Sequence, residues 1–224
     1  MPARISERAI ANIVLVLAAS IWGFATVVIK ITVAEVPPLT FLMLRFVSSA
    51  IILIPFIFYI LKRHKINRIR YKHIFTASLL GHIVALILIF LGIERTTAVE
   101  ASLITAFTPL LISAMGFFIL KETIKRNEIE GTLLAFLGTL IIVFSPLILA
   151  GNASEAGNLQ VIRNSVIGNI LFLCGITFDS LYSIYTKRHL AGDKIVTPMI
   201  QIVFSFVFAA IVFIPLGIGE QIFL

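Results

Sequence analysis

Charge is scarce in this chain. Only 13% of its 224 residues are charged and 59% are hydrophobic, with a mean hydropathy of +1.08. A soluble domain has about 25% charged residues and 45–50% apolar ones, so a water-exposed surface does not suit this composition. Cysteine is almost absent too: Cys174 stands alone, which excludes an internal disulfide, and no Cys/His spacing of the zinc type occurs. The composition therefore predicts a chain whose main solvent is lipid, without a metal site.

Catalytic and nucleotide-binding motifs are missing as well. The sequence contains no GxxxxGK[ST] phosphate loop, so hydrolysis of a nucleoside triphosphate is not indicated. It contains neither HExxH nor GxSxG, and no pair of aspartates stands in neighbouring hydrophobic segments. We therefore expect a protein that is not an enzyme and has no cofactor, with an intramembrane enzyme as one alternative.

Seven hydrophobic segments account for most of the chain. A helix that crosses a membrane needs about 20 mostly apolar residues, and each segment has roughly that length. Short polar connections separate the segments, and no low-complexity linker divides the chain into soluble domains. The sequence thus predicts an all-α integral membrane protein with about seven transmembrane helices, at residues 10–29, 39–61, 74–93, 97–120, 129–149, 166–186 and 196–216.

The positions of the basic residues predict the orientation of these segments. Of the eighteen Lys and Arg, fourteen precede the first segment or follow the second, fourth and sixth. Cytoplasmic loops carry such an excess, so we expect a cytoplasmic N-terminus and a place in the cell (plasma) membrane. The net charge of +7 is then a topology signal, and nucleic acid is not expected as a partner. A seven-helix receptor or sensor, the other alternative, would have its N-terminus outside.

The end of the chain repeats its beginning. The first segment aligns without gaps with the sixth, which pairs Asn12 with Asn169. The second aligns with the seventh, which pairs Phe46 with Phe206 and matches two prolines with two others. Because five segments separate the copies, they run in opposite directions across the membrane. Inverted repeats of this kind are typical of secondary transporters, whose substrate site lies near the midplane at the repeat interface.

A series of short motifs also runs through the first five segments and their connections. They are Trp22-Gly23, Lys30, Arg45, Ala101-Ser102, Pro109, Glu122, Gly131 and Gly138. In this order they resemble the EamA family of the drug/metabolite transporter superfamily, and the last two segments resemble it more loosely. The resemblance implies two inverted five-helix repeats around a central cavity, in a secondary transporter that moves small organic metabolites or drugs by alternating access.

The same resemblance predicts how the chain is divided. Residues 1–164 would form the first five-helix repeat, and residues 165–224 would form the start of the second, with two helices only. An incomplete second repeat would leave helix faces without partners, and a homo-oligomer is one way to cover them.

Polar side chains inside the hydrophobic segments are the candidate site. A charged residue at the centre of a membrane helix costs about 2.5–3.5 kcal/mol, so such residues usually face a bundle interior or a watery cavity. Asp179 interrupts the sixth segment, and Tyr182 shares its helix face in a polar stripe. His82 lies at a similar depth in the third segment, so we expect it to face Asp179 as a substrate or proton-coupling pair. A structural hydrogen bond between the two helices is the alternative.

Three further residues complete the predicted site. Arg45 and Glu100 both lie in the outer third of the membrane, which predicts an ion pair between the second and fourth segments. Contact with an anionic substrate, through the forked donors of Arg45, is the alternative. Trp22 stands in the middle of the first segment, either in a cavity wall or gate or in ordinary packing. The expected partners are a small-molecule substrate and the lipid bilayer.

Overall fold

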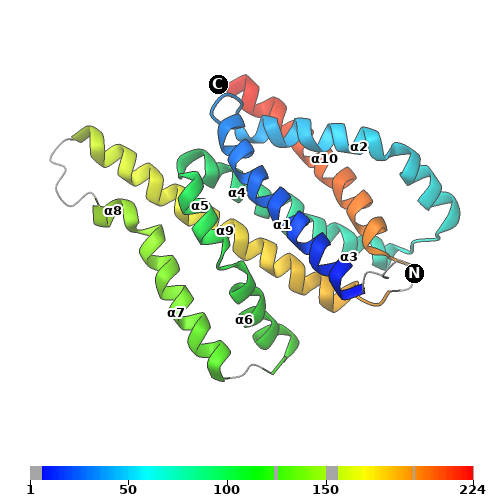
Figure 1. Cartoon of the computed structure of the whole chain (residues 1–224). Helices are drawn as coiled ribbons and strands as arrows, with labels where there is room; N and C mark the ends of the chain where they lie inside the picture. Colours follow the sequence, from blue (N-terminus) through cyan, green and yellow to red (C-terminus); the bar gives the residue numbers. More distant parts are fainter. Residues whose placement is uncertain (1–6, 124–125, 150–155, 194, 224) are drawn as a thin grey trace, which may run out of the picture.

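Every regular element in the described part of the protein is a helix (Figure 1). The computed structural model describes residues 7–123, 126–149, 156–193 and 195–223. The elements are α1 (Glu7–Thr32), α2 (Pro38–Arg63), α3 (Arg68–Ser78), η1 (Leu79–Val84), α4 (Ala85–Arg95), α5 (Ala98–Thr105), α6 (Thr108–Leu120), α7 (Arg126–Val143), α8 (Ser145–Leu149), α9 (Ala156–His189) and α10 (Pro198–Phe223). Within these residues, six helical stretches are long and apolar enough to cross a membrane: Ala9–Thr32, Pro38–Arg63, Arg68–Arg95, Ala98–Leu120, Gln160–His189 and Pro198–Phe223. An all-helical, multi-pass membrane protein is confirmed.

The predicted count of seven spans is not confirmed. The segment predicted at 129–149 forms α7 and the short α8, with an interruption at Phe144. Pro146 follows at once, and proline is tolerated in the first turn of a new helix but not in the interior of a continuing one. α7 is 18 residues long and three of its first five residues are charged, so, unlike the six longer stretches, it has no 18-residue window with two charges or fewer.

Two other predicted segments differ in outline. Ala98–Leu120 is divided at Ala106 and Phe107 into α5 and α6, and Pro109 lies in the first turn of α6. A proline there loses no helical hydrogen bond, which explains where the break falls. α9 is longer than predicted, because its first turns lie in what the sequence suggested to be a polar connection.

Two helix pairs build the core. α4 packs along α9, and α2 packs along α10. Glycines bring the first pair together: a Cβ added at Gly92 would lie 2.7 Å from the backbone nitrogen of Phe172. Small residues of this kind let membrane helices approach backbone to backbone. In the second pair, Phe46 of α2 stacks on Phe213 of α10, with ring centroids 5.4 Å apart. Both pairs therefore rest on specific close contacts.

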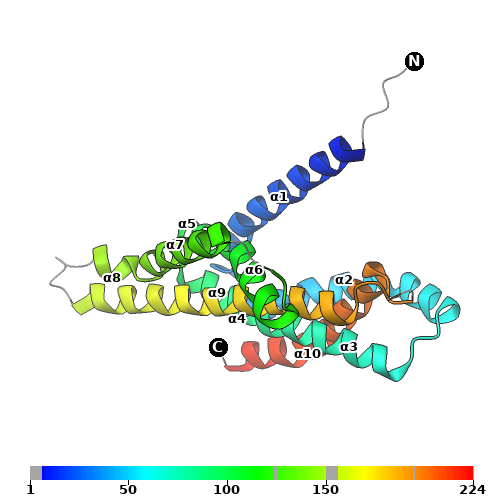
Figure 2. The ribbon, with the colours of Figure 1, turned by 90° about the horizontal axis from the view of Figure 1, so that it is seen from below.

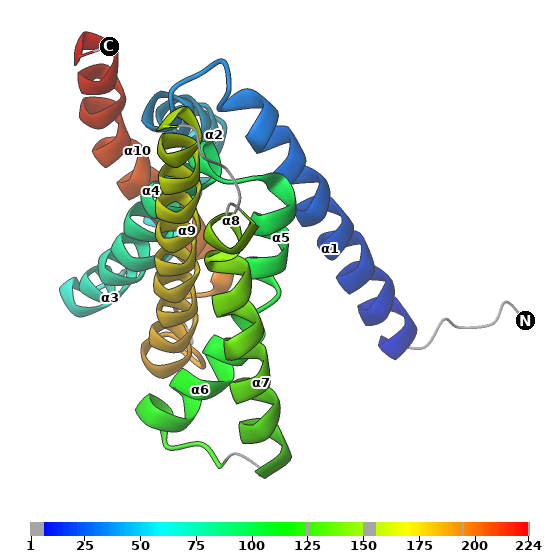
Figure 3. The same ribbon diagram turned by 90° about the vertical axis from the view of Figure 1, so that its left-hand side faces the viewer.

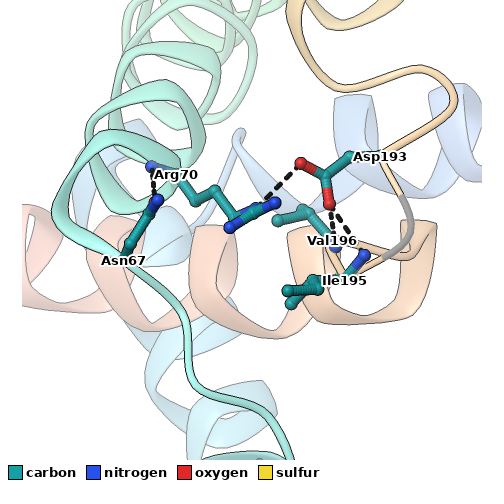
Figure 4. Close-up of polar contacts among 5 residues, drawn as sticks. All are labelled: Asn67, Arg70, Asp193, Ile195 and Val196. Carbon is teal, nitrogen blue, oxygen red and sulfur yellow. Dashed lines mark hydrogen bonds and ion pairs between the residues drawn. The ribbon is translucent and has the colours of Figure 1, made fainter.

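A single carboxylate holds the turn between α9 and α10. Asp193 Oδ1 accepts hydrogen bonds from the backbone N–H groups of Ile195 and Val196, at 2.7 and 3.0 Å (Figure 4). Its Oδ2 accepts a hydrogen bond from Nε of Arg70 in α3, at 2.8 Å. The bond from Val196, followed by those from Arg70 and Ile195, lowers the pKa of Asp193 to about 2. The turn is thus fixed to the start of α3.

α1 stands apart from the other helices. It diverges from them toward its N-terminus in Figures 2 and 3. Near its other end, Lys30 Nζ donates hydrogen bonds to the backbone oxygens of Ile93 and Glu94, at 2.7 and 3.0 Å. None of the most apolar 18-residue window of α1 is buried. α1 is therefore anchored at one end, where it meets the last turn of α4.

Candidate functional site

Aromatic rings surround His82 where four elements meet. The His82 ring, in η1, contacts Tyr182 of α9 and Phe206 of α10, with centroids 5.3 and 5.6 Å away. Phe46 of α2 lies 6.4 Å from the same ring, and Phe46 and Phe206 meet edge to face at 5.2 Å. We call these four side chains, His82, Tyr182, Phe206 and Phe46, the His82 cluster. The cluster joins α2, η1, α9 and α10.

The local sequence explains this close approach. Gly81 precedes His82, and a Cβ added at Gly81 would lie 2.5 Å from the Tyr182 ring. A larger residue would therefore push Tyr182 away from the imidazole. His82 also stands in the π-helical turn Leu79–Val84, which lies within an otherwise α-helical stretch. Such turns are rare and occur frequently at functional sites.

One nitrogen of His82 is unsatisfied. His82 Nδ1 is buried and has no hydrogen-bond partner among the described residues. Leaving a buried polar group without a partner costs about 1–3 kcal/mol. This nitrogen can therefore take a hydrogen bond from, or give one to, a ligand that enters the cluster.

Two opposite charges flank the cluster. The guanidinium carbon of Arg45 lies 5.8 Å from the centroid of the Phe46 ring, and its charge acts on His82. Asp179 lies one helical turn before Tyr182 on α9 and acts electrostatically on the phenol. Both side chains are half-buried, and within the described residues neither forms an ion pair. Neither group therefore has an oppositely charged partner in the part of the chain that the structure describes.

The polar stripe predicted on the sixth segment faces the neighbouring helices. The Tyr182 hydroxyl accepts a hydrogen bond from Gln201 Nε2 at 3.1 Å, and the same nitrogen donates to Thr186 Oγ1 at 3.2 Å. A Cβ added at Gly175 would lie 2.8 Å from the backbone nitrogen of Ile89. Gln201 was not among the predicted site residues, although a lone amide in an apolar segment is the same kind of signal that singled out Asp179.

The expected direct pair of His82 and Asp179 is not formed. No hydrogen bond joins them, and Tyr182 is the α9 residue whose ring contacts the imidazole. Tyr182 lies one helical turn from Asp179. The sequence therefore predicted the depth of the contact with His82 to within one turn, but it did not predict which side of α9 faces His82. The roles of His82, Asp179 and Tyr182 in substrate binding or coupling stay predictions.

The predicted ion pair between Arg45 and Glu100 is wrong. Glu100 forms a capping box with Thr97 instead: Glu100 N–H donates to Thr97 Oγ1, and Thr97 N–H donates to Glu100 Oε2, both at 3.1 Å. Glu100 Oε1 accepts from Ser145 Oγ at 3.2 Å and from Asn169 Nδ2 at 3.3 Å. The carboxylate is thus used at the start of α5. The T-x-x-E pattern of residues 97–100 was the available signal for this cap.

Asn169 completes this second polar centre. Its side chain is fully buried, and its Nδ2 also donates to the backbone oxygen of Val143 at 3.2 Å. The hydroxyl of Thr96 donates to its Oδ1. Asn169 of α9 therefore binds the ends of α4 and α7, a role that no sequence motif indicated beyond the repeated asparagine.

Trp22 belongs to neither polar centre. Its side chain is 67% exposed on α1. α1 diverges from the other helices toward its N-terminus (Figure 3), and a place for Trp22 in a cavity wall or gate, or in ordinary packing, stays a prediction. Trp22 faces the surroundings of the protein.

The side chains of the His82 cluster offer a ring nitrogen, a phenol hydroxyl and aromatic faces. Among the described residues no group of three His, Cys, Asp or Glu side chains is placed to hold a metal ion. The chemistry available there is hydrogen bonding, charge pairing with Arg45 or Asp179, and stacking on aromatic rings.

Comparison with known proteins gives a family and several relatives. The profile of the EamA-like transporter family matches residues 9–144. The uncharacterized transporter YetK of Bacillus subtilis is 27% identical over 94% of this chain and 60% of its own length. An uncharacterized transporter of Methanothermobacter thermautotrophicus is 26% identical over 74% of this chain and 50% of its own length. A WAT1-related protein of Arabidopsis thaliana is 27% identical over 80% of this chain and 56% of its own length. No solved structure matches significantly.

Proposed function

The chain belongs to the EamA-like transporter family, and from this premise we propose that it is a secondary transporter of small organic molecules. It spans 60% and 50% of the length of the first two relatives, so the activity of a whole transporter is part of the proposal. We further propose that transport proceeds by alternating access between inverted repeats, 1–164 and 165–224, in the cell membrane with the N-terminus cytoplasmic.

The His82 cluster carries this proposal. Phe46 and Phe206 are paired by the alignment of the second and seventh predicted segments, and their rings are in contact. Two residues at equivalent positions of two repeats can touch each other when both lie beside the symmetry axis that relates the repeats. His82 lies against both rings, which supports a site at the repeat interface, where inverted-repeat transporters bind their substrates.

The two ends of the α2–α10 pair support the same relation. Near one end, Thr40 N–H and Thr40 Oγ1 donate to Glu220 Oε2 at 2.6 and 2.9 Å. The alignment pairs Thr40 with Ile200 and Glu220 with Ile60. Ile60 and Ile200 line one pocket at the other end of the pair. The contact between Thr40 and Glu220 lies at one end of the α2–α10 pair, and the residues aligned with them, Ile200 and Ile60, lie together at the other end. An inverted repeat requires such an arrangement.

The test is transport by the purified chain in liposomes, offered a metabolite mixture and read by mass spectrometry. The variants are His82→Gln and Asp179→Asn, with Ser48→Ala as the control because Ser48 is exposed on α2 near Arg45. We expect the initial rate to fall about tenfold in the first two, the equivalent of one lost interaction of about 1.4 kcal/mol, and to stay unchanged in the control.

Two outcomes would contradict different parts of the proposal. Folded wild-type protein that accumulates no metabolite would refute transport by this chain. Wild-type transport that His82→Gln and Asp179→Asn leave intact would refute the His82 cluster as the site and leave the transporter assignment standing.

A further inference from the structure

A pocket of about 410 Å³ opens where α2 ends and α10 begins, far from the His82 cluster along α2. Ligand pockets typically have volumes of roughly 300–1,000 Å³, so its size suits a bound molecule. Phe56 and Tyr59 of α2 and Met199 of α10 are exposed in it, which opens the pocket sideways to the surroundings of the helices. Its lining is mostly apolar: Pro55, Phe56, Tyr59, Ile60, His64, Thr197, Met199 and Ile200.

Basic residues stand at one end of this pocket. His64 lines the pocket, and Lys62, Arg63 and Lys65 stand on either side of it in the sequence. The guanidinium of Arg63 donates a hydrogen bond to the Tyr59 hydroxyl and lies 5.7 Å from the centre of the Tyr59 ring. Arg63 is therefore held at the rim of the pocket by a residue that lines it. Its exposed side chain has no acidic partner among the described ion pairs.

The pocket reaches from this basic rim into the apolar part of the span. Pro55 precedes Arg63 by eight residues, which is about 12 Å along a helix at 1.5 Å per residue. A molecule that fills the pocket therefore has an apolar part of that length and an anionic group beside Arg63. Basic pockets between membrane helices bind anionic lipid head groups in the same way.

The opposite end of the same helix pair has neither feature. There Glu220 accepts hydrogen bonds from the backbone N–H groups of Leu39 and Thr40, at 3.2 and 2.6 Å. A Cβ added at Gly217 would lie 2.7 Å from Met43 Cβ, so the helices are in close contact. That end is closed and carries an acidic side chain, which would repel an anion.

From the apolar pocket and its basic rim, we propose that this end of the α2–α10 pair binds one anionic phospholipid. An acyl chain lies in the pocket against Phe56 and Met199, and the head-group phosphate accepts hydrogen bonds from Arg63. This proposal does not depend on transport activity.

Native mass spectrometry of the delipidated full chain in detergent tests the proposal, with phosphatidylglycerol, phosphatidylcholine and glycerol phosphate as probes. We expect one phosphatidylglycerol per chain, about tenfold tighter binding than phosphatidylcholine, and no competition by glycerol phosphate. Arg63→Gln should reduce the preference for phosphatidylglycerol about fivefold, which corresponds to one basic contact with an anionic lipid. Met199→Trp, which fills the pocket, should reduce binding of both lipids.

Lys72→Gln is the matched control, because Lys72 is an exposed basic residue of α3 that does not line the pocket. Its lipid binding should equal that of the wild type. Equal losses in Lys72→Gln and Arg63→Gln would show general surface attraction and overturn the site. Competition by glycerol phosphate would show a free-anion site, and unchanged lipid binding in Met199→Trp would exclude the pocket. Circular dichroism and a monodisperse elution profile establish that each variant is folded.

Discussion

α1 and α9 align with each other in sequence but have opposite surroundings. Asn12 of α1 is exposed, whereas the aligned Asn169 of α9 is fully buried and hydrogen-bonded to three other segments. Gly23 of α1 has nothing within 4 Å of an added Cβ, whereas Gly168 and Gly175 of α9 would place a Cβ less than 3 Å from α4 atoms.

Hydropathy does not explain this difference. The apolar stretch of α1 has a mean hydropathy of 2.2 and that of α9 only 1.6, yet 28% of the α9 window is buried and none of the α1 window. In a bilayer, lipid solvates apolar side chains as well as a protein core does, so packing depends on small residues and polar contacts instead. α9 has small residues and polar contacts where it faces α4, whereas α1 has such features only in its last turns.

The largest effect is expected when the α4–α9 contact is broken. Gly92→Leu puts a side chain where the backbone of Phe172 lies 2.7 Å away, and backbone atoms cannot move aside without separating the helices. We expect a loss of about 2–3 kcal/mol in stability. The measurement is the thermal unfolding midpoint in detergent micelles.

Gly23→Leu is the counterpart on α1. An added Cβ there has nothing within 4 Å, so the stability of the variant should stay within about 0.5 kcal/mol of the wild type. Equal destabilisation by Gly23→Leu and Gly92→Leu would mean that α1 is as closely packed as α9, and would end the comparison.

The second prediction concerns the aligned asparagines. Asn169→Ala removes the donor to Glu100 and Val143 and leaves the buried Val143 carbonyl without it, so we expect a loss of about 1–2 kcal/mol. Asn12→Ala removes an exposed amide and should be neutral. Thermal midpoints of the two variants, measured together, give the difference directly. Equal midpoints would show that the buried network contributes nothing beyond packing.

The sequence predicted the helical class, most spans and the polar positions, but not their neighbours. Composition and run length determine which residues enter a membrane, and these can be counted along the chain. Helix rotation is a tertiary property, so Tyr182 and not Asp179 contacts His82. Glu100 shows a second limit: the intramembrane charge was recognised, but the T-x-x-E cap that uses it was overlooked. Trp22 shows a third, because no pattern within α1 tells whether another helix covers it.

The smallest effect is expected in the turns that lead out of α1 and α9. The turn after α9 depends on Asp193, whose pKa is about 2 instead of 3.8. A lowered folded-state pKa contributes stability that is fully present above about pH 4 and is lost as the pH falls through about 2. Asp193→Asn should therefore lower stability at pH 7, by no more than about 1 kcal/mol because the pair with Arg70 is partly exposed.

At pH 2 the difference between Asp193→Asn and the wild type should shrink to about half or less, because half of the wild-type carboxyl groups are then protonated. Glu35→Gln, in the turn after α1, is the control, since the hydrogen bonds described for residues 33–36 run between backbone atoms. Its midpoint should follow the wild type at both pH values. A deficit in Asp193→Asn that is the same at pH 7 and pH 2 would mean that the turn depends on the shape of the side chain and not on its charge. The turns after α1 and α9 would then differ in the shapes of their side chains and not in a stabilising charge.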